Sequence, residues 1–97
     1  MKKGYWIVAY QTVGDDASMK SYGELAGAAL APFGVRILVS PKSVVTPRES
    51  GLDKMIVVVE FNSCADALAA YETPDYRSAI NALGPEVIRD CRIVEGS

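Results

Sequence analysis

Two side chains of opposite charge, Arg36 and Glu60, stand alone among apolar residues that have the pattern of strands. A turn near Arg48 would join these strands in an antiparallel hairpin and place the pair roughly opposite each other. A partly buried arginine can bind the carboxylate or enolate of a small acid, and Glu60 could then act as a base or an orienting group. A cross-strand ion pair without chemistry is the simpler interpretation.

The aromatic residues are the second set of chemical candidates, because the chain has five tyrosines and one tryptophan. Tyrosine hydroxyls can act as acids or hydrogen-bond donors, and aromatic rings commonly line ligand pockets. Tyr22 therefore joins Arg36 and Glu60 as a candidate catalytic residue. The candidate ligand-binding residues are the other rings expected to line a pocket: Trp6, Tyr71 and Tyr76. The simpler interpretation is that these rings fill the core and send their hydroxyls to its rim.

Histidine is absent, which removes the Ser-His-Asp and Cys-His nucleophile pairs, histidine metal sites and the usual base near neutral pH. We assign no metal, since Asp15 and Asp16 are better explained as the start of a helix. We also assign no cofactor. The two cysteines, Cys64 and Cys91, are expected to be buried thiols rather than a disulfide. Cys64 near a helix start could be reactive, although a small apolar role is the simpler interpretation.

The charge pattern argues against a nucleic-acid partner, because the net charge is −2 and no basic cluster exceeds the pair Lys2-Lys3. The first apolar run is too short for a membrane span, and no cleavage site follows it. We therefore expect a cytoplasmic protein with no membrane partner. The remaining arginines are interpreted as solvated surface charges: Arg48, Arg77, Arg89 and Arg92. Arg48 lies in a loop that could act as a lid.

The elements that must position these residues alternate in a simple order. Aromatic and β-branched runs predict strands at Tyr5–Gln11, Val35–Ser40, Lys54–Phe61 and Val87–Glu95. Helical periodicity predicts one helix from Asp15 to Phe33, and a second, broken at Thr73-Pro74, from Ser63 to Leu83. Pro41 places the second strand at a sheet edge. The β-α-β-β-α-β order predicts an α+β ferredoxin-like fold, with the helices on one face of a four-stranded antiparallel sheet.

The predicted sheet is apolar on both faces. The first strand carries Tyr5, Ile7 and Ala9 on one face and Trp6, Val8 and Tyr10 on the other, and the third strand is apolar on both. Helices can cover only one face in this topology. We therefore expect a homodimer in which the open sheet face packs against a second copy.

Several segments resemble the bacterial proteins grouped as domain of unknown function family 1330. The resemblance covers nearly the whole chain and rests on Lys3–Ile7, Met19–Tyr22, Val57–Ser63, Ala67–Tyr76 and Val94–Gly96. It implies a dimeric α/β barrel, in a superfamily that includes cofactor-free monooxygenases, haem-degrading enzymes and small isomerases. Two family features are missing: Val39-Ser40-Pro41 replaces an Arg-Gly-Gly, and Leu83 replaces an arginine, which implies a different ligand or none.

Two functional hypotheses follow for a single domain spanning residues 1–97. The first is a small-molecule-binding protein or cofactor-free enzyme of monooxygenase or isomerase type, whose ligand is a small organic acid or an apolar molecule. It expects a cavity between sheet and helices that reaches Arg36 or Glu60 together with a tyrosine hydroxyl. The second is a non-catalytic dimeric structural or accessory module, which expects a fully packed interior.

Overall fold

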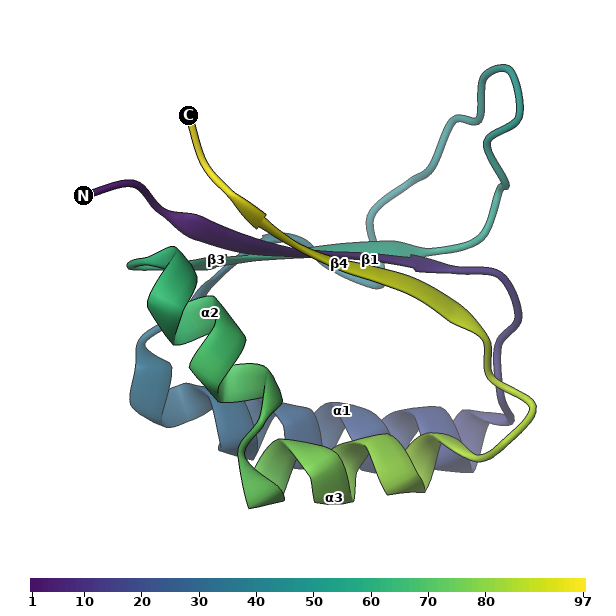
Figure 1. Cartoon of the computed structure of the whole chain (residues 1–97). Coiled ribbons are helices and arrows are strands. Elements are labelled where there is room, and N and C mark those ends of the chain that lie inside the picture. Colours follow the sequence, from purple (N-terminus) through teal and green to yellow (C-terminus); the bar gives the residue numbers. More distant parts are fainter.

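The computed structural model describes residues 1–97 and contains one antiparallel sheet with all its helices on one side (Figure 1). The strands are β1 (Gly4–Tyr10), β2 (Arg36–Val39), β3 (Ile56–Phe61) and β4 (Arg89–Glu95). The helices are α1 (Asp16–Leu30), α2 (Cys64–Tyr71) and α3 (Pro74–Leu83), and a 3-10 turn at Ala31–Phe33 extends α1. The sheet order is β2-β3-β1-β4, which confirms the expected ferredoxin-like topology.

Local chemistry sets the helix starts. The side chains of Asp15, Ser63 and Thr73 each accept a hydrogen bond from a backbone N–H in the first turn of the helix that follows. These caps satisfy donors that have no partner within the helix. Thr73 and Pro74 also separate α2 from α3, so the predicted break in the second helix is confirmed.

The β2–β3 hairpin has the expected register. Arg36 lies opposite Glu60, and β2 is an edge strand that ends at Val39, shortly before Pro41. A register shift between Ile37 and Val39 interrupts the pairing there. The strand at this edge of the sheet is therefore short and irregular.

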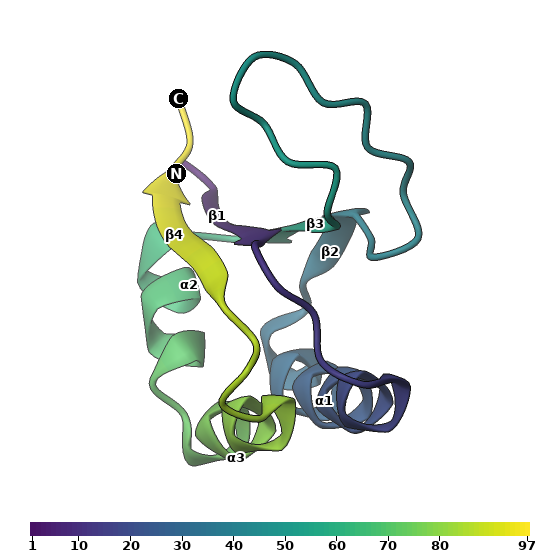
Figure 2. The same cartoon turned by 90° about the vertical axis from the view of Figure 1, so that its right-hand side faces the viewer.

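The two faces of the sheet have different surroundings. Trp6, Val8 and Tyr10 of β1 point toward the helices and are buried. Tyr5 and Ile7 point to the open face, where Ile7 remains 39% exposed. The connection between β2 and β3, residues 40–55, projects from the open face away from the helices (Figures 1 and 2). We call this segment the arm.

The helices cover the sheet unevenly. Helix α2 packs against β1, β3 and β4, whereas α1 makes its main contacts with α3. Figure 2 shows α2 and α3 below the β4 side of the sheet and α1 below the β2 side. Helix α1 therefore lies on the β2 side, where Ala26, Ala29 and Leu30 are its residues in the buried core. None of the helices is long and apolar enough to cross a membrane.

Candidate functional site

An apolar cleft lies between α1 and the helix-facing side of the sheet. Its volume is about 620 Å³, which falls in the usual range for small-molecule sites. The sheet contributes residues from all four strands, and the helix contributes residues from one side of α1. The two ends of the arm also reach the cleft through Ser40, Pro41 and Met55. Its apolar walls include Trp6, Val8, Met19, Leu30, Met55 and Val57. We call this feature the α1 cleft.

Small residues of α1 keep the cleft open. Gly23, Ala26 and Gly27 all line it, and a Cβ atom added at Gly23 or Gly27 would meet no atom within 4 Å. Glycine inside a helix costs about 1 kcal/mol relative to alanine. Both glycines are therefore unfavourable for helix stability, yet they leave space along the side of α1 that faces the cleft.

One end of the cleft is polar. Arg89 is the first residue of β4 and lies opposite Tyr10 in β1, so its side chain emerges on the helix-facing side. Its Nη1 donates to the Tyr22 hydroxyl at 3.0 Å and its Nη2 to the Tyr76 hydroxyl at 3.4 Å. The guanidinium carbon also lies 5.1 Å from the centre of the Tyr22 ring and 5.7 Å from that of Tyr10, within cation–π range.

The protonation states at this end are set by burial and by these contacts. Burial is the main cause that raises the pKa of Tyr76 and of Tyr10, so both hydroxyls keep their protons at neutral pH. Burial alone would lower the pKa of Arg89, but the oxygens of Tyr22 and Tyr76 outweigh it and the pKa is raised. Arg89 is therefore a permanent cation beside neutral phenols.

Arg89 corrects one interpretation of the sequence, which treated it as a solvated surface charge. The side chain is instead half-buried and lines the α1 cleft. The sequence did contain a sign that Arg89 faces the helices. Every second residue of a strand shares a face, so Arg89 shares its face with Cys91 and Ile93. Cys91 and Ile93 pack against the buried core, so the same face carries Arg89 toward the helices.

The predicted ligand-binding rings form a connected cluster, of which only Trp6 lines the cleft. Tyr76 is fully buried with its ring centre 4.7 Å from that of Trp6, and Tyr71 meets Trp6 edge-on at 5.8 Å. The indole Nε1 of Trp6 donates to the Ala67 carbonyl at 2.8 Å. Tyr71 and Tyr76 thus pack behind the cleft wall and hold Trp6 in place.

Arg36 and Glu60 lie on the open face, away from Tyr22. Arg36 Nε donates to Glu60 Oε1 at 2.5 Å, and the hydroxyl of Tyr5 donates to Glu60 Oε2 at 2.8 Å. The hydrogen bond from Arg36 and then that from Tyr5 lower the pKa of Glu60. The expectation of one cavity shared by this pair and a tyrosine hydroxyl is wrong, because neither hollow of the chain is lined by Arg36 or Glu60.

The cysteines lie apart from this chemistry. Both are free thiols and neither is fully buried, and burial raises the pKa of Cys91. Cys64 is the first residue of α2, where its backbone closely approaches β1: a Cβ added at Gly4 would come within 2.5 Å of the Cys64 Cα. No group of three or more metal-ligating side chains is present.

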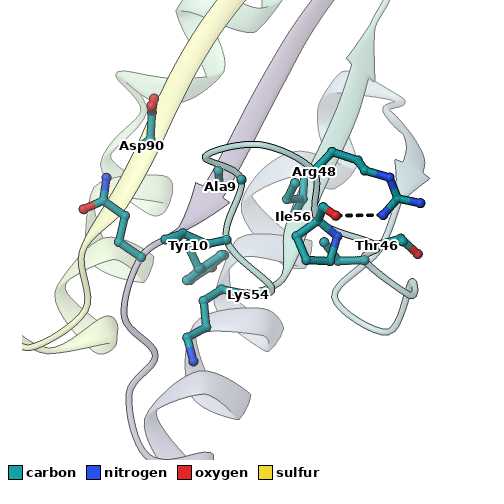
Figure 3. Close-up of a pocket in the computed structure, with 12 residues that line it drawn as sticks. Ala9, Tyr10, Thr46, Arg48, Lys54, Ile56 and Asp90 are labelled. Atoms are coloured by element: carbon teal, nitrogen blue, oxygen red, sulfur yellow. Dashed lines mark hydrogen bonds between the residues drawn. The ribbon is translucent and has the colours of Figure 1, made fainter.

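A smaller hollow of about 360 Å³ lies between the arm and the open face. Figure 3 shows Ala9, Ile56 and Asp90 contributed by the sheet, with Arg48 and Lys54 contributed by the arm. The Arg48 guanidinium turns back to donate to the Pro47 carbonyl at 2.8 Å. Arg48 therefore lies over the open face, and it is not positioned as a lid for the α1 cleft.

The fold places the chain among ferredoxin-like α+β proteins. The protein belongs to the family described as "Domain of unknown function (DUF1330)", whose model matches residues 3–97. No curated protein matches the sequence significantly.

Solved structures with a similar fold are also described as being of unknown function. A protein from Rhodopseudomonas palustris has a TM-score of 0.70 and 11% identity, with 99% of this chain and 83% of that chain covered. A dimeric ferredoxin-like protein from Bacteroides fragilis has a TM-score of 0.60 and 22% identity, with 96% and 95% covered. A dimeric ferredoxin-like protein from Thermobifida fusca has a TM-score of 0.52 and 14% identity, with 97% and 91% covered.

Proposed function

We propose that this protein binds a small, mainly apolar molecule in the α1 cleft. The observation that carries the proposal is a cleft of about 620 Å³ whose walls are mostly apolar and which the chain's own side chains leave unfilled. Apolar surface exposed in a cleft gains free energy when a ligand removes it from water. The two glycines of α1 that border the cleft support the same conclusion, since larger residues there would favour the helix but fill the space.

Binding is better supported than catalysis. A cofactor-free monooxygenase or isomerase would need a group that takes a proton from the substrate, and the cleft is lined by no carboxylate, lysine or histidine. Tyr22 and Arg89 can stabilise negative charge on a bound oxygen. Tyr22 is therefore the candidate for an acid or donor role, whereas Arg36 and Glu60 could take part only through a site on the open face.

We also propose that two copies pack through their open sheet faces. Exposed apolar residues support this arrangement, with Ile7 at 39%, Val94 at 41% and Val44 of the arm at 94% exposure. Two of the structural neighbours are described as dimeric. The cytoplasm is the proposed location, because its reducing conditions keep two free thiols reduced.

The alternative is a non-catalytic dimeric module in which the α1 cleft has no ligand. The arm and the apolar open face favour the hypothesis of a non-catalytic module, because both are surfaces suited to a protein partner. The two hypotheses differ in the expected effect of filling the α1 cleft. Filling the α1 cleft abolishes function under the first and leaves it unchanged under the second.

The test is a titration with N-phenyl-1-naphthylamine, a neutral apolar dye whose fluorescence rises in apolar surroundings. Gly27→Phe places a ring where a Cβ meets open space, so we expect a folded protein that has lost at least tenfold in dye affinity. The matched control is Ala28→Phe, one residue along α1 at an exposed position outside the cleft lining. Unchanged dye affinity in Gly27→Phe would contradict the proposal.

A further inference from the structure

A cation without an acidic partner stands at one end of the α1 cleft. Arg89 takes part in none of the chain's ion pairs. The neighbouring Asp90 points to the other face of β4 and pairs with Arg92, with Nε and Oδ1 at 3.0 Å. Moving a cation out of water without a paired anion is unfavourable, so this end of the cleft favours an anionic group.

The guanidinium of Arg89 has donors to spare. Of its five N–H groups, one bonds the Tyr22 hydroxyl and one the Tyr76 hydroxyl. The Tyr10 hydroxyl also lies close enough to Arg89 for the guanidinium to oppose the rise in the Tyr10 pKa that burial causes, yet three phenols cannot occupy all five donors one to one. The planar fork of a guanidinium matches the two oxygens of a carboxylate. The cleft therefore contains a directional donor set as well as a charge.

The Tyr22 hydroxyl adds another donor. This follows from where the hydroxyl protons of Tyr22 and Tyr76 point. The oxygens of Tyr22 and Tyr76 are 2.6 Å apart, so one hydroxyl donates to the other. Tyr76 is fully buried, and the only other hydrogen-bond partner of its hydroxyl is a donor, Arg89. Because buried donors are almost always satisfied, the Tyr76 proton goes to the Tyr22 oxygen. The proton of Tyr22 then remains free at the cleft wall.

We propose that Arg89 and Tyr22 form a headgroup site for a small organic acid. Its carboxylate accepts hydrogen bonds from the Arg89 fork and from the Tyr22 hydroxyl, and its apolar body lies along the wall formed by Trp6, Val8 and Val57. This inference rests on the proposed function, because it names the class of ligand for the same cleft. It replaces the Arg36–Glu60 pair with Arg89 as the group that recognises the carboxylate.

The experiment displaces bound N-phenyl-1-naphthylamine with two matched compounds, 3-phenylpropionate and its neutral amide 3-phenylpropanamide. The acid should displace the dye from the wild-type protein at about 10- to 100-fold lower concentration than the amide, the range expected for hydrogen bonds to a charged group. Arg89→Met should remove this advantage. The control Arg92→Met, an exposed arginine on the opposite face of the same strand, should keep it.

Equal displacement by acid and amide in the wild-type protein would overturn the inference, as would an advantage that survives Arg89→Met. Should Arg89→Met unfold the protein by circular dichroism, Tyr22→Phe takes its place, since it keeps the ring but removes the free donor. A several-fold smaller advantage in Tyr22→Phe supports the site, and an undiminished one contradicts it. Failure of the dye to bind the wild-type protein would instead contradict the proposed function itself.

Discussion

At the scale of single residues, the chain separates its charged groups by their partners. Arg36 has a carboxylate and forms a network with Glu60 and Tyr5 on the open face. Arg89 has no carboxylate partner and instead contacts tyrosine hydroxyls and aromatic rings. The first arrangement already pairs its charges, as expected of a structural ion pair, whereas the second leaves a cation that the proposed anionic ligand would pair.

The Glu60 network has a testable pH dependence. The hydrogen bonds from Arg36 and Tyr5 lower the pKa of Glu60 in the folded state, so the carboxylate stabilises the fold above the ordinary glutamate pKa. That stabilisation is lost as the pH falls through the lower, folded-state pKa. Urea unfolding between pH 6 and pH 2.5 should show a free energy of unfolding that declines less steeply in Glu60→Gln than in the wild-type protein.

In Tyr5→Phe, the decline of the free energy of unfolding with falling pH should be intermediate between those of the wild-type protein and Glu60→Gln. This variant removes only one of the hydrogen bonds that lower the pKa of Glu60. Parallel curves for the wild-type protein and Glu60→Gln would show that this carboxylate does not contribute to acid stability.

At the scale of elements, the local signals of the sequence were sufficient to predict the strands and helices. Caps, prolines and alternation predicted each strand and helix, and the Arg36–Glu60 register followed from the hairpin alone. The last strand begins two residues later than predicted. The carbonyl of Ile88 accepts hydrogen bonds from both Gln11 and Thr12, so regular pairing with β1 starts only at Arg89.

The position of the candidate site could not be predicted in the same way. Sequence reasoning identified Tyr22 and Trp6 as pocket residues, and both line the α1 cleft. It missed Arg89 and Gly27, because their significance depends on how far α1 stands from the sheet, which is a property of the packing of α1 against α3. No local pattern encodes that distance.

The proposed packing of two copies through the open sheet face predicts the mass of the protein in solution. Light scattering of the purified protein should give twice the 10.4 kDa mass of one chain, and Ile7→Glu should give the monomer mass, because a carboxylate at the centre of this face would be buried in the dimer. Leu68→Glu is the matched control, an exposed leucine on α2 at 54% exposure on the helix side. A monomeric wild-type protein, or dimers in both variants, would contradict the sheet-to-sheet arrangement.

At the scale of the whole molecule, the two proposed activities use different sides of the sheet. The α1 cleft lies on the helix-facing side, and the proposed dimer interface lies on the open face with the arm (Figure 2). A second copy on the open face would therefore leave the cleft accessible. On these two proposals, the same four strands would supply one wall of a ligand site and one half of an interface, and a sheet that is apolar on both faces is what such a double use requires.

The methionines report directly on whether the ligand binds in the α1 cleft. Of the three in the chain, Met19 and Met55 line the cleft, whereas Met1 is fully exposed at the N-terminus. Methyl NMR spectra of protein labelled with [methyl-13C]methionine, recorded during titration with 3-phenylpropionate, should show saturable shifts of the Met19 and Met55 signals and a stationary Met1 signal. Stationary Met19 and Met55 signals at saturating acid would show that the acid does not bind in the α1 cleft.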